Sequence, residues 1–134
     1  MNLPLLIAIA GVLHLGILLA SASVPQVLEW RRELAQLQPL SRHVVWVHGA
    51  FIVLVIVGFG AISLILPSEL ASGTHLARAC CGFIALFWAA RLAIQFLLFD
   101  ARPYLKTPLL RLGYHGLTAV FTYFAVVYTL AATT

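Results

Sequence analysis

Five polar side chains of this sequence lie inside long apolar runs, where burying a polar group is costly. They are His14, His48, His115, Arg91 and Gln95. Imidazole nitrogens bind haem iron and transition metals, and a guanidinium binds carboxylates such as porphyrin propionates. Polar groups within membrane segments face the interior of a bundle and by default indicate function. The set therefore predicts a cofactor site in a membrane protein.

The elements that must position these side chains are membrane-spanning helices. The 134 residues are 63% hydrophobic and only 9% charged, which excludes a soluble domain. A span needs about 20 apolar residues, and runs this long favour helices over the alternating strands of a barrel. Four such runs occur, at about Leu3 to Ser23, Val44 to Leu66, Leu76 to Phe99 and Leu109 to Ala131.

The chain is predicted to form a single transmembrane domain over residues 1–134. The fold class is all-α, an integral membrane four-helix bundle, and the topology is up-down-up-down because the linkers are short. Residues 24–43, 67–75 and 100–108 are expected to be loops. The first run lacks the basic start of a signal peptide and is interpreted as a retained span.

The positions of the basic residues predict the orientation in the membrane. Six of the eight Lys and Arg residues gather on one side, around the first and third linkers: Arg31, Arg32, Arg42, Arg102, Lys106 and Arg111. Because basic loops stay cytoplasmic, both termini are expected on the non-cytoplasmic side of a bacterial-type cytoplasmic membrane. The net charge of +4 is then explained by topology and by contact with anionic lipid. No nucleic-acid partner is predicted.

The five polar side chains converge on the cytoplasmic half of the predicted bundle. At about 1.5 Å per residue, His48 and His115 lie at nearly the same level, and His14 is displaced by about one turn. Arg91 and Gln95 share one helix face because they are four residues apart. Depth alone therefore brings the candidate site residues together.

In an up-down bundle the second and fourth helices are diagonal, so His48 and His115 are expected to face each other across the core. Such a pair holds a b-type haem, and His14 is the alternative axial ligand or a hydrogen-bond donor to a quinone. Glycines adjoin these histidines in "LHLG", "VHGA" and "GYHGL". Their missing side chains let a flat macrocycle, or another helix, approach closely.

Arg91 is expected to need an anionic partner inside the membrane. A haem propionate or a quinone oxygen would serve, and Asp100 is the alternative within the chain. Gln95 lies on the same face and is included among the cofactor-binding candidates. Trp88, one turn before Arg91, is a candidate for lining the core.

These residues predict a membrane b-type haem protein that transfers electrons between quinol and a partner protein, with the haem near the cytoplasmic side. An axial histidine pair suits electron transfer, and an oxidase-like activity becomes the expectation if only one histidine binds the iron. One alternative is a protein that binds copper or another transition metal through His14, His48 and His115. A further alternative is a cofactor-free assembly subunit of a larger membrane complex.

Short motifs add a resemblance to these inferences. They are His14, His48, "FDARPYL" at residues 99–105 and "GYHG" at residues 113–116. With four spans, the chain resembles the small membrane proteins of the CopD-like and HemJ-type protoporphyrinogen oxidase group and related uncharacterised families. The resemblance implies binding of haem or a metal in the bundle. HemJ-type proteins also have a functional lysine, whereas the one lysine here, Lys106, lies in a predicted loop.

Overall fold

Residues 2–98 and 105–134 are described by a computed structural model, and over these ranges the chain is helical with no strand. The helices are α1 (Leu3–Val27), α2 (Trp30–Leu34), α3 (Pro39–Ile65), α4 (Pro67–Leu70), α5 (His75–Leu97) and α6 (Pro108–Thr133). The helices α1, α3, α5 and α6 are long and apolar enough to cross a membrane. The predictions of an all-α chain and of four such helices are confirmed.

The helix ends are set by capping residues and differ from the ends of the apolar runs. Side-chain oxygens of Asn2, Thr74 and Thr107 accept hydrogen bonds from the first turns of α1, α5 and α6. Proline opens α3 and α6, where its missing N–H costs nothing. Hydropathy marks the part of a helix that suits lipid, whereas caps decide where the helix begins. Residues 24–43 and 67–75 were expected to be loops, but they contain the short helices α2 and α4.

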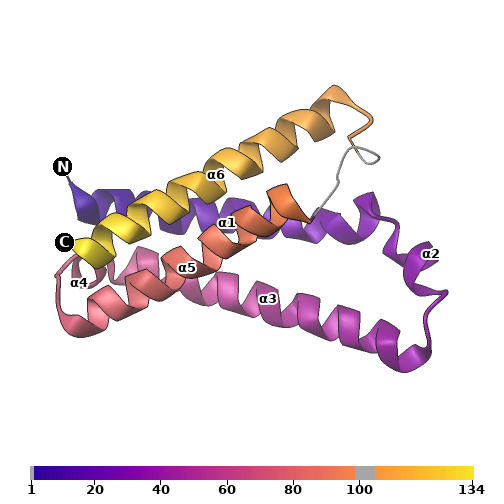
Figure 1. Ribbon diagram of the computed structural model, residues 1–134, viewed down its shortest axis with the longest axis horizontal. Helices are drawn as coiled ribbons and strands as arrows, with labels where there is room; N and C mark the ends of the chain where they lie inside the picture. The colour runs from indigo at the N-terminus through magenta and orange to yellow at the C-terminus, as the bar shows by residue number, and fades with distance from the viewer. Residues whose placement is uncertain (1, 99–104) are drawn as a thin grey trace.

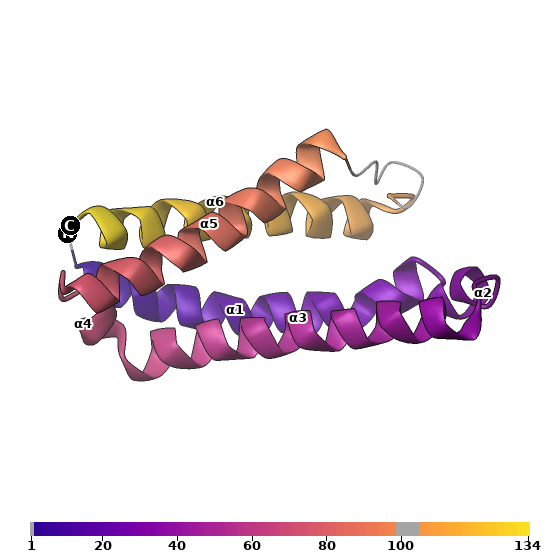
Figure 2. The same cartoon turned by 60° about the horizontal axis from the view of Figure 1, so that its bottom comes forward.

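The long helices pack as two pairs. Helix α1 lies against α3 and helix α5 lies against α6, and α1 also contacts α6. Figure 1 shows the N and C termini at the same end of the molecule, beside α4. Figure 2 shows the α1–α3 pair as one layer and the α5–α6 pair as the other, with α5 rising away from the first layer towards its C-terminal end.

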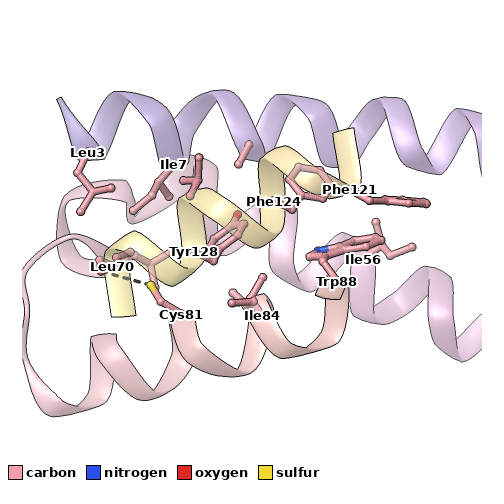
Figure 3. Close-up of a cluster of buried hydrophobic side chains, with 14 of the residues drawn as sticks. Leu3, Ile7, Ile56, Leu70, Cys81, Ile84, Trp88, Phe121, Phe124 and Tyr128 are labelled. Atoms are coloured by element: carbon pink, nitrogen blue, oxygen red, sulfur yellow. Dashed lines mark hydrogen bonds between the residues drawn. The ribbon is translucent and has the colours of Figure 1, made fainter. Parts of the chain in front are cut away.

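A buried cluster joins the two layers near the end that holds the termini (Figure 3). Hydrogen bonds between helices accompany this cluster. For example, the hydroxyls of Ser63 and Tyr128 lie 2.5 Å apart, and the hydroxyl of Tyr123 donates to the carbonyl of Leu6 at 2.8 Å. Lipid is as apolar as the core, so van der Waals packing and bonds of this kind hold the helices together. Ile17, Ile56, Trp88 and Phe121 belong to this cluster and also line the cleft described below.

Helices α1 and α3 pack closely together where Gly11 and Gly60 meet. A Cβ added at Gly60 would lie 3.0 Å from the Cβ of His14, and one added at Gly11 would lie 2.7 Å from a side-chain carbon of Leu64. The missing side chains allow the two backbones to come together, as small residues do between membrane helices. By contrast, a Cβ at Gly113 or Gly116 would meet nothing within 4 Å. The glycines next to His115 therefore border open space rather than a helix contact.

Candidate functional site

A cleft of about 470 Å³ lies between the two helix pairs. Helix α1 contributes one face to it, through Ile17, Ala20, Ser21 and Val24, which recur at helical spacing. Helices α3, α5 and α6 supply the remaining walls, including the aromatic rings of Phe83, Phe87, Trp88 and Phe121. Among the described lining residues, Arg91 is the one with a charged side chain.

The guanidinium of Arg91 lies deep in the span. Its Cζ atom is 5.2 Å from the centre of the Phe121 ring, a cation–π distance. Phe121 lies at the middle of α6 and is buried. Arginines near helix ends usually extend towards the membrane surface, whereas this one is held at the level of the middle of a neighbouring helix. The predicted partner Asp100 lies outside the described residues.

Trp88 connects this cation to the core. Its ring stacks on Phe121, with the centroids 5.1 Å apart and an angle of 18° between the planes, and Figure 3 shows the two rings together. Trp88 is only 2% exposed, so the expectation that it lines the core is confirmed. The same side chain forms part of the cleft wall. Trp88 thus touches both the core and the cleft.

His14 is fully buried and both of its ring nitrogens are in hydrogen bonds. Nδ1 lies 2.7 Å from the carbonyl oxygen of Ala10, and Nε2 lies 3.1 Å from the indole nitrogen of Trp88. Because an indole N–H only donates, Nε2 is the acceptor and Nδ1–H donates to Ala10. The ring also stacks on Phe124, with centroids 4.1 Å apart. The imidazole is therefore neutral, and in this arrangement neither nitrogen is available to a metal or an iron atom.

Gln95 is buried and ties α5 to α6. Its side-chain amide donates to the hydroxyl of Thr118 at 2.6 Å, and that hydroxyl donates to the carbonyl of Tyr114 at 3.0 Å. Gln95 follows Arg91 by one turn of α5. Arg91 lines the cleft, whereas the Gln95 amide bonds to α6. The Gln95 amide therefore holds α5 and α6 together near the cleft.

His48 and His115 are both exposed on the outside of the helices. Nδ1 of His48 donates to the carbonyl of Val44 in its own helix at 2.8 Å, and the ring of His115 lies edge-on to Tyr114. The expected arrangement, with these imidazoles facing each other across the core, differs from the structure. Counting residues gives the depth of a side chain, whereas packing between helices decides in which direction it points.

Over residues 2–98 and 105–134, no group of three or more His, Cys, Asp or Glu side chains gathers as a metal ion would require. The three histidines proposed as metal or haem ligands are divided, with His14 in the core and the other two outside. Nor does the described cleft wall contain an imidazole. A haem or copper site within one copy of the chain does not fit this arrangement, and both cofactors stay predictions from the sequence.

Sequence reasoning missed the aromatic residues of α6 that pack against Trp88 and His14. Phe121 and Phe124 on α6 are buried against Trp88 and His14. Their spacing of three residues, continued by Tyr128, places them on one helix face, and this periodicity was the available signal. Apolar residues in a span give a weak signal, because lipid accepts them on every face.

The chain matches no family model, and comparison with curated proteins and with solved structures gives no match. The resemblance to the CopD-like and HemJ-type group therefore stays a prediction from short motifs.

Proposed function

We propose that this chain is an integral membrane protein that binds a lipophilic small molecule of the isoprenoid quinone class in the cleft between its helix pairs. The observation that carries the proposal is the guanidinium of Arg91 in the wall of a largely apolar cleft, at the depth of the middle of α6. An ionisable group inside a membrane marks a binding site by default. Its N–H groups donate to acceptor oxygens.

Depth favours a quinone over a phospholipid as the occupant. Helix α6 has 26 residues and is therefore about 39 Å long. The hydrocarbon layer is about 30 Å thick, so the middle of the helix lies about 15 Å below the headgroups. A phosphate stays at the headgroups, whereas the carbonyl oxygen of a neutral quinone ring enters the hydrocarbon layer at little cost.

The aromatic side chains of the cleft suit a planar ring. Phe87, Trp88 and Phe121 contribute to the wall near Arg91, and aromatic rings pack well against flat conjugated molecules. Aliphatic residues such as Ile52 and Ile94 also line the cleft and suit an isoprenoid tail. In this arrangement Arg91 orients the ring by donating to one carbonyl oxygen. Electron transfer between the quinol and a partner protein stays a prediction from the sequence.

The proposed topology is an up-down-up-down bundle with both termini on the non-cytoplasmic side. Arg31, Arg32, Arg42 and Arg111 belong to the end opposite the termini, in agreement with the rule that basic loops stay cytoplasmic. A cysteine placed at Thr134, in a chain whose Cys80 and Cys81 are replaced by alanine, tests the orientation. Labelling of intact cells by an impermeant maleimide is expected, and labelling only after lysis would reverse the orientation.

Binding of a short-tailed benzoquinone to the detergent-purified protein tests the function. We expect saturable quenching of tryptophan fluorescence, because Trp88 lies in the cleft wall. Filling the cleft by Ala20→Phe should weaken binding at least about tenfold, which corresponds to about 1.4 kcal/mol. Leu19→Phe, one residue earlier at a position that is 78% exposed, is the matched control and should bind normally.

Two outcomes would overturn the proposal. Equal quenching of both variants and of free tryptophan would show that the probe has no site in the cleft. The absorption spectrum of the same preparation, oxidised and then reduced, is the other check. Sharp reduced bands that disappear in His115→Ala would make a b-type haem the cofactor, as the sequence predicted, and would require a site shared between chains or a different packing of the helices.

A further inference from the structure

His14 is a buried ionisable group that the proposed quinone site does not use directly. It is fully buried near the middle of α1 and belongs to no part of the described cleft wall. A polar ring in this position is costly unless its nitrogens have partners. The partners that the structure gives it, Ala10 and Trp88, show what the ring does.

A continuous set of contacts leads from His14 to the cleft. Nε2 of His14 accepts the indole N–H of Trp88, the indole ring stacks on Phe121, and Phe121 lies under the guanidinium of Arg91. Trp88, Phe121 and Arg91 all line the cleft. His14 is therefore one hydrogen bond away from the cleft wall.

We infer that His14 is a positioning residue, which fixes the orientation of Trp88 and through it the shape of the quinone-binding cleft. The inference rests on the proposed function for the identity of the ligand, but the bond between His14 and Trp88 can be tested without any ligand. An indole N–H buried among apolar groups needs an acceptor. Without Nε2, the indole N–H loses its acceptor in the present orientation, so the ring that forms part of the cleft wall is no longer held in place.

The surroundings of His14 hold the ring in the orientation that this role needs. The bond from Nδ1–H to Ala10 leaves Nε2 as the acceptor, and stacking on Phe124 fixes the plane of the ring. On the side of α3, the absent side chain of Gly60 makes room for the Cβ of His14. A neutral imidazole supplies the donor and the acceptor together, which leucine in the same space does not.

Nitrogen NMR of the unsubstituted protein tests the inference without a mutation. With ¹⁵N-histidine, we expect His14 as the tautomer with the proton on Nδ1 and an unprotonated, hydrogen-bonded Nε2. The signal is assigned by its loss in His14→Gln. A proton on Nε2 would overturn the inference, because that nitrogen would then be unable to accept from Trp88.

Substitution then tests whether the bond matters for the cleft. In a chain with Trp30→Phe and Trp46→Phe, Trp88 gives the one indole N–H signal. In this background, the protein with His14 is compared with His14→Gln and His14→Leu. Glutamine places an acceptor near the position of Nε2, so His14→Gln should keep the indole signal and the benzoquinone affinity near wild type. His14→Leu should shift the indole signal upfield and weaken binding by about threefold to tenfold, the value of one hydrogen bond.

The outcomes separate the two proposals. An unchanged indole signal in His14→Leu would overturn the positioning role, and so would equal loss of affinity in His14→Gln and His14→Leu. If the indole signal responds as expected but the unsubstituted protein binds no benzoquinone, the quinone function fails while the bond between His14 and Trp88 stands. Should His14→Leu fail to fold, the tautomer measured in the unsubstituted protein still decides whether Nε2 accepts from Trp88.

Discussion

Gly60→Leu is expected to separate α1 from α3 and to cost about 3 kcal/mol of stability or more, at the upper end of the effects of overpacking. The first added carbon would already lie 3.0 Å from the Cβ of His14 and 3.5 Å from the carbonyl oxygen of Gly11. Neither neighbour can move aside easily. His14 is held by its bonds to Ala10 and Trp88, and the oxygen of Gly11 belongs to the helix backbone.

Unfolding of the detergent-purified protein by increasing fractions of SDS measures this effect through helix content. Gly58→Leu is the matched control, because it adds the same side chain to the same helix at a position where a Cβ meets nothing within 4 Å. Gly58→Leu should unfold close to wild type. Similar losses in the two variants would mean that leucine harms α3 itself, and that the contact between Gly11 and Gly60 does not decide the packing.

Arg91→Leu is expected to reduce benzoquinone affinity by about tenfold to a hundredfold, the range for a hydrogen bond to a charged group. The guanidinium is the charged group of the described cleft wall and lies over Phe121. Leucine keeps an apolar wall but removes every donor. Arg91→Lys should bind with intermediate affinity, because an ammonium retains the charge but lacks the planar group that stacks on a ring.

The dissociation constant from fluorescence quenching measures this prediction. Arg78→Leu is the control, since Arg78 is not among the described cleft residues and donates to the carbonyl of Ala132. Unfolding in SDS checks that Arg91→Leu still folds, so that a loss of binding is attributed to the missing guanidinium. If Arg91→Leu binds the probe as tightly as wild type, the guanidinium does not bind the ligand oxygen and the quinone proposal loses its main support.

The sequence by itself determined the number and approximate extent of the long helices. Hydropathy is a local property, so a run of about 20 apolar residues identifies a span without knowledge of its neighbours. The positions of the basic residues, which predict the orientation in the membrane, are likewise read from the sequence without knowledge of the packing. Helix ends were less accurate: α3 begins at Pro39, before the predicted Val44, because capping and proline rather than hydropathy fix the start.

Only the tertiary structure decided which faces of the helices turn inwards. Residue counting placed His48 and His115 at one depth, but both side chains are exposed. The rotation of each helix about its axis follows from contacts between distant residues, such as Gly11 with Gly60 and His14 with Phe124. The role of His14 depends on Trp88, which lies 74 residues away in the chain. A single sequence contains both residues, but the bond between them exists only once α1 and α5 have packed.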